Sequence, residues 1–261
     1  MLNNIKSLFN LKTLFEYVSE KYKLKLIIYN NQLKNRLGIN LQTYKEKSGI
    51  CRTIQKNGQG QEKSLKTNKV IFKGQYSNGK RNGLGAEYNS KTGKLIFQGN
   101  YLNGKRSGKG KEYDQNIKCI FEGEYLNGKK DGKGKEYLFT YNHLQLIYEG
   151  EFSNGKRNGY GREYDFHLGL IFEGEFSKGN HWNGRGDEIE IGRVIYTGDF
   201  FHGEKSGRGK EYSLDRSKIY EGDFLKGKKN GEGKVFNNDF NGNLIYEGIF
   251  LDGKLIKKIN H

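Results

Sequence analysis

The histidines and cysteines are the side chains of this sequence best suited to metal binding or nucleophilic chemistry, and their spacing favours neither. Cys51 and Cys119 stand far apart and form no metal-binding motif, which argues against a zinc site and a disulfide scaffold and favours a reducing compartment. His143 and His167 occupy equivalent places in a repeat, but a metal site needs further ligands and none shares that register. We therefore expect solvated histidines, no metal and no cofactor.

Two recurring patterns look like nucleotide-binding or catalytic motifs but lack the context that such motifs need. Pairs such as Gly83 and Gly85 resemble part of a phosphate-binding loop, which requires a helix to begin directly after the glycines. Here residues with strand character follow, and the pair recurs along the chain. Glutamates recur beside recurrent lysines, a pattern typical of cross-strand ion pairs on a solvated face. Since no Ser-His-Asp, Cys-His or paired-carboxylate arrangement stands out, we expect no enzymatic activity.

A block of about 24 residues repeats along the chain and must position all of these side chains. One copy reads IFEGEYLNGKKDGKGKEY over residues 120–137. Its first glycine recurs at intervals of 24 to 27 residues, at Gly74, Gly99, Gly123, Gly150, Gly174, Gly198, Gly222 and Gly248. Positions are counted within each unit from this glycine as 0, and units one to eight begin with Gly74. Such a repeat predicts units that bury their apolar faces against one another, an architecture that offers a surface rather than a reaction.

Aromatic residues stand two positions before and two positions after each of these glycines, from Phe72 and Tyr76 to Tyr246 and Phe250. Residues two apart in a strand share a face, so the pattern predicts a half-buried strand with its aromatics on one face. An Asn-Gly turn follows, and then a second strand whose glycine pair we expect to leave room for neighbouring rings. A third aromatic ends this strand, and we expect it in the core as well. These third aromatics are Tyr88, Tyr113, Tyr137, Tyr164, Tyr212 and Phe236.

Each unit is therefore predicted to be a β-hairpin, and hairpins must stack because one alone is marginal in water. The fold class that follows is mainly β, an elongated single-layer antiparallel solenoid of stacked β-hairpins with a short N-terminal helical or mixed cap. Some eighteen strands at ~4.7 Å each would extend roughly 80 Å, as a twisted sheet with a groove.

The chain divides into two segments of different character. Residues 1–45 show helical spacing of apolar side chains from Ile5 to Tyr22 and then alternation typical of a strand. This segment is expected to cap the first strand of the array, and the alternative is a helix that docks on a partner or a membrane surface. The array covers residues 46–261, with a degenerate first unit at 46–70, seven full units at 71–244 and a truncated last unit at 245–261.

The pattern Y/F-x-G-x-Y/F, then N-G-K, then G-x-G resembles the MORN repeat (membrane occupation and recognition nexus), and the resemblance covers residues 46–261. It implies an elongated single-layer β structure. Some MORN proteins attach the array to a lipid kinase or SET methyltransferase domain, and no segment here is long or distinct enough to be one. Similar stand-alone MORN proteins serve in cytoskeletal and ciliary assemblies, which implies by analogy a cytoplasmic scaffold.

The net charge of +16 favours acidic partners, namely anionic phospholipid, acidic protein tails or nucleic acid. Basic pairs in the turns would form a ridge along one edge if the units stack in register. This candidate ridge comprises Lys80, Arg81, Lys105, Arg106, Lys129, Lys130, Lys156, Arg157, Lys228 and Lys229. It would meet anionic lipid or an acidic protein tail, or only protect an edge from aggregation. Nucleic acid is disfavoured because stacking needs free aromatic faces and most rings are assigned to the core.

The turn of unit five departs from the others by one extra residue and by Trp182, the only tryptophan. Exposed tryptophan often anchors interfaces, so Trp182 is a candidate anchor, with a local loop filler as the alternative.

Taken together, the sequence predicts a non-catalytic cytoplasmic scaffold that presents an aromatic-lined concave sheet to protein partners, by analogy in a cytoskeletal or ciliary assembly. The alternative is a peripheral membrane adaptor that binds anionic phospholipid through the basic ridge and the N-terminal helix. We expect no membrane span and no secretion, because the chain has no apolar run of ~20 residues and no secretory apolar core. A homodimer through the array edges stays open.

Overall fold

The computed structural model describes residues 31–37, 49–140, 143–215, 217–237 and 242–259. The amphipathic helix predicted near the N-terminus and the strand after it fall in residues 1–30, outside the described residues, so the N-terminal cap stays a prediction. Among the described residues, one helix, α3 (Asn31–Leu37), precedes eighteen strands. The strands are β1 (Ile50–Ile54), β2 (Gln59–Ser64), β3 (Val70–Ser77), β4 (Lys80–Tyr88), β5 (Leu95–Leu102), β6 (Lys105–Tyr113), β7 (Cys119–Leu126), β8 (Lys129–Thr140), β9 (His143–Ser153), β10 (Lys156–Asp165), β11 (Gly169–Ser177), β12 (Asn180–Glu190), β13 (Arg193–Phe201), β14 (Glu204–Tyr212), β15 (Lys218–Leu225), β16 (Lys228–Phe236), β17 (Leu244–Leu251) and β18 (Lys254–Ile259).

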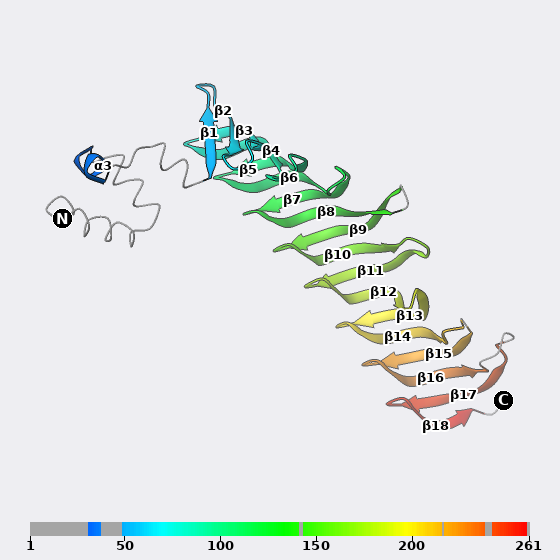
Figure 1. The fold of residues 1–261 in the computed structure, drawn as a ribbon. Coiled ribbons are helices and arrows are strands. Elements are labelled where there is room, and N and C mark those ends of the chain that lie inside the picture. The colour runs from blue at the N-terminus through cyan, green and yellow to red at the C-terminus, as the bar shows by residue number, and fades with distance from the viewer. Residues whose placement is uncertain (1–30, 38–48, 141–142, 216, 238–241, 260–261) are drawn as a thin grey trace.

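Each strand pairs antiparallel with the next strand in the chain, so that β1 to β18 form one open sheet. Figure 1 shows this sheet as an elongated, twisted ribbon with the strands side by side in chain order. A tight turn joins the two strands of each unit, and a longer connection leads to the next unit. The prediction of a mainly β, single-layer array of stacked hairpins is confirmed.

The turn within each unit consists of two residues with positive φ, as the Asn-Gly pairs predict. In unit one these are Asn78 (φ +49°) and Gly79 (φ +70°), and the equivalent residues of units two to eight also have positive φ. Two successive residues of this conformation make a type I′ turn, whose twist matches that of the flanking strands.

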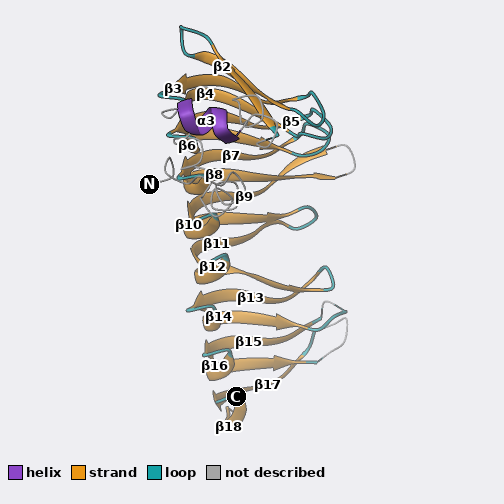
Figure 2. Cartoon of the chain, turned by 60° about the vertical axis from the view of Figure 1, so that its left-hand side comes forward, coloured by secondary structure: helices purple, strands orange, loops and turns teal. Residues whose placement is uncertain are grey.

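A bulge in the second strand folds each turn back over the sheet. In unit one the single residue Gln75 faces three residues of β4. The glycine of this bulge, Gly83, has φ +92°, and the Gln75 side chain accepts a hydrogen bond from the backbone N–H of Leu84 at 2.8 Å. The turn of the following unit adds a further tie, because the N–H of Gly104 donates to the carbonyl of Arg81 at 2.8 Å. Figure 2 shows how strongly the strands curl at one end.

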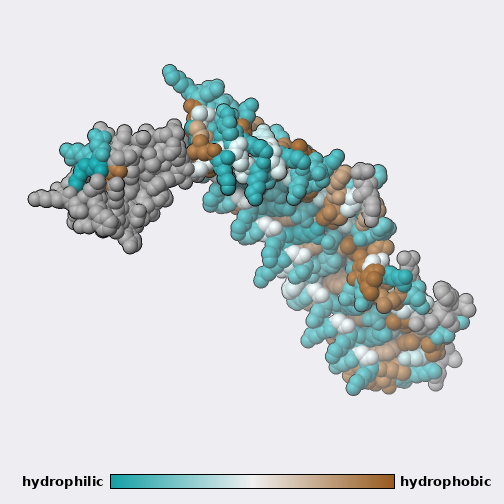
Figure 3. Space-filling view, viewed as in Figure 1, coloured by the Kyte–Doolittle hydropathy of each residue, from teal (hydrophilic) through white to brown (hydrophobic). Residues whose placement is uncertain are grey.

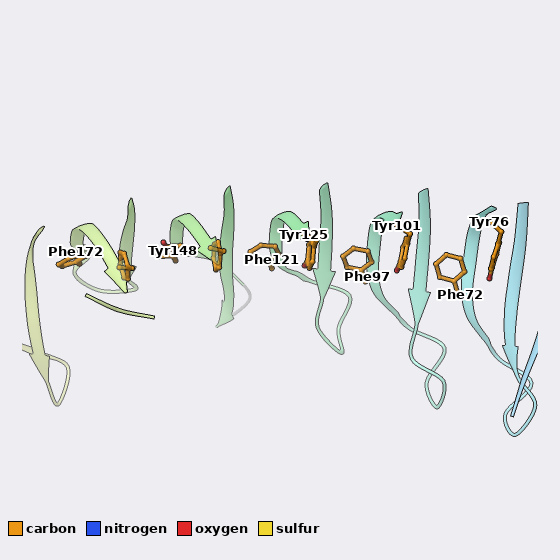
Figure 4. Close-up of a cluster of buried hydrophobic side chains, with 10 residues drawn as sticks. Phe72, Tyr76, Phe97, Tyr101, Phe121, Tyr125, Tyr148 and Phe172 are labelled. Atoms are coloured by element: carbon orange, nitrogen blue, oxygen red, sulfur yellow. The ribbon is translucent and has the colours of Figure 1, made fainter. Parts of the chain in front are cut away.

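The aromatic residues at positions −2 and +2 form a row that the bent hairpins enclose. Successive rings meet edge to face, for example Phe72 with Tyr101 (centroids 5.0 Å apart) and Phe97 with Tyr125 (5.1 Å). Figure 4 shows rings from consecutive hairpins alternating along this row. The row is the core of the molecule, since Phe72 and Phe97 have no exposed surface. Each such ring pair adds roughly 1 kcal/mol beyond the area that it buries.

Paired glycines form the floor under these rings. Gly99 pairs with Gly110, and a Cβ atom on Gly110 would lie 2.4 Å from Cζ of Phe97. This confirms that the second glycine of each pair leaves room for a ring. The first glycine has a different role, because Gly108 (φ +75°) lies in the bulge, where a left-handed conformation is required.

The third aromatic of each unit was expected in the core, and this prediction is wrong. Tyr137 and Tyr164 lie half-buried on the opposite face, where their hydroxyls donate to Glu122 (2.7 Å) and Glu149 (2.8 Å). The reason is strand alternation, since the preceding residue, Glu136, shares the face of the aromatic row and so turns its neighbour away.

The last described strand is β18, and here unit eight lacks both glycines of the second strand. Lys257 and Ile259 stand at these two positions, and Gly248 pairs with Lys258 instead of a glycine. Exposed lysines on an edge strand discourage the addition of further strands. A homodimer through the edges stays a prediction.

Candidate binding surfaces

Carboxylates and cations alternate above the aromatic row and close it from solvent. We call this arrangement the charge ladder. It consists of the base at position +7 and the glutamate at position +13, which lies on the second strand after the bulge. Its members are Glu62, Arg81, Glu87, Arg106, Glu112, Lys130, Glu136, Arg157 and Glu163, with Glu188, Lys205, Glu211 and Lys229 after unit five. Each base in the row contacts the glutamate of the preceding unit, which ties neighbouring hairpins together.

Glu62 begins the ladder and is the one buried acidic residue of the described chain, with 2% of its surface exposed. Its carboxylate accepts hydrogen bonds from Arg52 (2.9 Å), from Arg81 (2.7 Å) and from the hydroxyl of Tyr76 (3.0 Å). Burial by itself would raise the pKa of Glu62, but the hydrogen bond and charge of Arg81, together with Arg52, lower it below the ordinary value. The degenerate unit at residues 46–70, which precedes unit one, therefore still supplies a fully partnered end to the ladder.

The structure divides the ten residues of the candidate basic ridge into two sets. Those at position +7 belong to the charge ladder and lie over core rings: Arg81, Arg106, Lys130, Arg157 and Lys229. Those at position +6 are exposed at the turns: Lys80, Lys105, Lys129, Lys156 and Lys228. Adjacent residues of a strand point to opposite faces, which is why one base of each pair is used internally.

Exposed leucines lie directly beside the exposed lysines of the turns. Position +3 pairs with position +6, as Leu102 does with Lys105 and Leu126 with Lys129. Leu102 and Leu126 are each more than half exposed. We call these lysines and leucines the turn edge. Sequence reasoning missed the leucines, although their recurrence at +3 is visible in the sequence.

The face of the sheet opposite the aromatic row and the charge ladder carries a groove of about 1150 Å³ that crosses β4 to β10. We call this face the groove face. Five of its glycines line the groove: Gly110, Gly123, Gly134, Gly150 and Gly161. Acids on β7 and β9 alternate with bases on β6, β8 and β10: Glu122, Glu124, Glu149 and Glu151 with Lys109, Lys111, Lys133, Lys135 and Arg162. The groove therefore carries charges of both signs and is open along the array axis.

Cross-strand ion pairs on this face confirm the interpretation for glutamates at position −1, whereas the glutamates at +13 belong to the charge ladder over the core. Lys111 contacts Glu122 at 2.8 Å, and Lys135 contacts Glu149 at 3.2 Å. The acids at position +1 have a second role that sequence reasoning missed, because Glu124 accepts a hydrogen bond from the backbone N–H of Lys133 at 3.1 Å and so holds the bulge. The signal was an acid or amide at this position in units one to seven.

The aromatic-lined concave surface predicted from the sequence is wrong. The rings at −2 and +2 lie beneath the charge ladder, and apart from the partly buried Phe200 and Tyr246 they are at most 7% exposed. Edge-to-face packing within and between units, together with the cations of the charge ladder, covers the ring faces. The accessible long surfaces are the groove face and the two edges.

Hydrophobic side chains gather at the other edge, where the connections between units lie. Figure 3 shows hydrophilic residues over most of the face in view and hydrophobic residues along this edge. Exposed members are Leu138, Leu144, Phe166, Leu168, Leu170 and Ile191.

Trp182 lies on β12 beside the turn, with 37% of its surface exposed. Its ring stacks on His202 (4.9 Å between centroids), and His202 in turn stacks on Phe201 (4.0 Å). Phe201 is the +3 residue of unit six, so this aromatic group continues the turn edge.

Of the histidines, His143, His167 and His202 are exposed, as expected, whereas His261 lies outside the described residues. His181 differs from the expectation, because it is half-buried against Phe172 in the core. Within the described ranges there is no group of three or more His, Cys, Asp or Glu that could hold a metal ion. The same part of the chain contains no helix of the length and apolarity needed to cross a membrane.

Comparison with known proteins agrees with this geometry. Six segments match the MORN repeat family, at residues 72–90, 97–116, 121–142, 148–165, 196–217 and 220–238. They fall on units one to four, six and seven of the array. No curated protein shows significant similarity to the chain. The aromatic-glycine-aromatic pattern, the stacked hairpins and the six matches together establish that the chain belongs to the MORN-repeat proteins.

Proposed function

We propose that this MORN array is a non-catalytic scaffold that holds protein partners on its groove face. The observation that supports the proposal is the continuous groove across β4 to β10. Because glycines line it, a partner can approach the backbone of the sheet closely. Because acids and bases alternate along it, it would select a partner by the pattern of its charges rather than by net charge.

The test compares two variants with the same change in charge in the same two hairpins. K109E/K133E alters the groove, and K105E/K129E alters the turn edge; all four lysines are exposed. Tagged wild-type protein and both variants are purified gently from the native cell, and the accompanying proteins are identified by mass spectrometry. We expect stoichiometric partners with the wild type and with K105E/K129E, and their loss with K109E/K133E. Retention of all partners by the groove variant would contradict the proposal.

We further propose a cytoplasmic location and partners from a cytoskeletal or ciliary assembly. This rests on analogy with similar stand-alone MORN proteins. The same purification tests it, because cytoskeletal or axonemal proteins should dominate the wild-type sample, and a constant set of unrelated proteins would refute it.

A second candidate function is attachment to an anionic membrane through the turn edge. The observation that favours it is the pairing of exposed Lys105 and Lys129 with exposed Leu102 and Leu126, because basic residues bind anionic headgroups while leucines enter the interface. Vesicle flotation would test it, with phosphatidylserine-containing and neutral vesicles. Binding should need the anionic lipid, weaken as salt rises, and be lost in K105E/K129E and weakened in L102S/L126S. Equal flotation of wild type and K105E/K129E would refute membrane attachment.

A further inference from the structure

Unit five, formed by β11 and β12, interrupts the glycine floor that runs through the array. In the other full units the glycine at position 0 pairs with the second glycine of the following strand, as Gly150 does with Gly161. In unit five Gly174 pairs with Gly184, the first glycine, while Gly186 lies opposite Phe172. The extra residue in the turn thus shifts the pairing of β12 with β11, so that the first glycine of β12 takes the place that the second glycine has in the other units.

The charge ladder is also interrupted at unit five. Arg157 of unit four contacts both Glu136 and Glu163, which joins two units. His181 takes the equivalent place in unit five, and its Nε2 lies 2.6 Å from Glu163. The next carboxylate, Glu188, pairs with Lys205 of unit six at 2.7 Å. Among the ion pairs of the described residues, none joins His181 to Glu188.

The buried core divides at the same place. One cluster of buried rings ends at Phe176 and the other begins at Tyr196, with the partly buried Phe200 packed against both. The Phe172–Phe200 centroids lie 6.0 Å apart at 70°, whereas the next contact across units, Tyr196–Phe224, measures 5.1 Å at 81°. The ring of His181 stacks on Phe172 at 3.8 Å and occupies the place that an arginine or lysine has elsewhere.

We propose that unit five is a joint at which the array bends between two stiffer segments, β2–β10 and β13–β18. In a repeat array the stiffness comes from the interfaces between neighbouring units. Here the glycine floor and the charge ladder change within unit five, and the ring row changes where unit five meets unit six, so bending concentrates at this unit. The groove lies entirely within β4–β10, so bending moves the C-terminal segment without deforming the groove.

Two spin-label pairs of equal span test the joint. The labelled positions are Lys80, Lys156 and Lys228, all exposed at position +6. K80C/K156C spans three hairpins within the first segment, and K156C/K228C spans three hairpins across unit five, about 29 Å in each case. Cys51 and Cys119 are replaced by serine in every sample. Pulsed electron paramagnetic resonance should give a broader distance distribution for the pair across unit five, and equal widths would overturn the proposal.

A regularised unit five provides the causal test. Deleting Trp182 and introducing H181R restores the turn pattern of the other units, and the K156C/K228C distribution should then narrow to the width of the control pair. Persistence of the broad distribution in this folded variant would overturn the proposal. The reciprocal variant carries K130H and an inserted tryptophan after residue 130, which should broaden the K80C/K156C distribution. An unchanged width in this variant, with circular dichroism like the wild type, would equally count against the joint.

Discussion

The guanidinium carbon of Arg106 lies 4.0 Å from the centre of the Phe97 ring, while its nitrogens reach Glu87 and Glu112 at 2.7 Å each. Glu87 belongs to unit one and the other three residues to unit two. One side chain thus closes the core of its own hairpin and fixes the hairpin before it. Burial alone would lower the pKa of Arg106, but the two carboxylates raise it, so the residue stays charged.

Replacing Arg106 by alanine should destabilise the array far more than replacing its neighbour Lys105. R106A leaves two carboxylates without their cation and uncovers a ring, at a cost of about 2–3 kcal/mol. K105A removes an exposed side chain and should change stability by less than about 0.5 kcal/mol. Hydrogen exchange of the β5 and β6 amides is the suitable measurement, because long arrays need not unfold in one step. Equal exchange rates in the two variants would contradict the role of the ladder.

The division between Arg106 and Lys105 also shows how far the sequence alone determines the architecture. Two adjacent bases at a turn look alike in the sequence, and which one turns inward depends on a bulge whose position is not visible there. The hairpins themselves were predictable. The Asn-Gly pair marks the turn, and the aromatics at positions −2 and +2, which share one face of a strand, mark the strand and its buried face.

The face of the third aromatic was not predictable by the rule that aromatics belong in the core. Counting onward from the second glycine places Glu136 over the rings and Tyr137 on the groove face. A carboxylate over a hydrophobic core contradicts the usual burial preference. It is tolerated here because Lys130 and Arg157 each pair with it at 2.9 Å, contacts that arise from the fold of the turns.

The carboxylate of Glu62 should make the N-terminal end of the array sensitive to acid. Its folded-state pKa is lowered, so its contribution is fully present above the ordinary value of ~4.3 and is lost as the pH falls through the lower folded value. E62Q should cost about 3 kcal/mol at pH 7, and the difference from wild type should shrink below about pH 4.

Urea unfolding at a series of pH values measures this effect. D252N is the matched control, because Asp252 is exposed and lies 4.0 Å from Lys228; it should change stability by less than about 0.5 kcal/mol. A constant difference between E62Q and wild type down to strong acid would be inconsistent with the buried ion pairs of Glu62.

Alanine at two glycines of unit two should separate the two uses of glycine in the fold. A Cβ at Gly110 meets the Phe97 ring at 2.4 Å, so G110A must displace a core ring and should cost about 3 kcal/mol. Gly104 has φ +88° with nothing within 4 Å, so G104A carries only conformational strain of about 1 kcal/mol. Thermal unfolding of both variants provides the comparison, and a greater loss in G104A would show that ring packing is not what excludes Cβ atoms from the floor.

Two buried tyrosines should make the array sensitive to alkali. Burial raises the pKa of Tyr148 and of Tyr220 to about 12, and each hydroxyl donates to a backbone carbonyl, of Glu151 (3.0 Å) and Asp223 (3.2 Å). A raised folded-state pKa means that the contribution is complete below the ordinary value of ~10 and is lost as the pH rises towards 12.

Y148F/Y220F should therefore keep its circular dichroism to higher pH than wild type between about pH 10 and 12. Phenolate absorbance followed in parallel should show two fewer late-ionising tyrosines in the double variant than in wild type. If the double variant unfolds at the same alkaline pH as wild type, these hydroxyls do not control the transition.

Trp182 should act as an interface anchor independently of the joint, and one substitution distinguishes the two roles. W182A keeps the extra residue in the turn, so the register of β12 and the spin-label widths should not change. The exposed ring stacked on His202 is lost, however, and the affinity for a partner that contacts this edge should fall about tenfold or more. As the only tryptophan, Trp182 also reports binding in the wild type, because burial by a copurified partner should shift its emission to shorter wavelength. An unshifted emission together with unchanged affinity in W182A would show that the Trp182 ring does not contribute to binding. The spin-label test of the joint does not depend on this result.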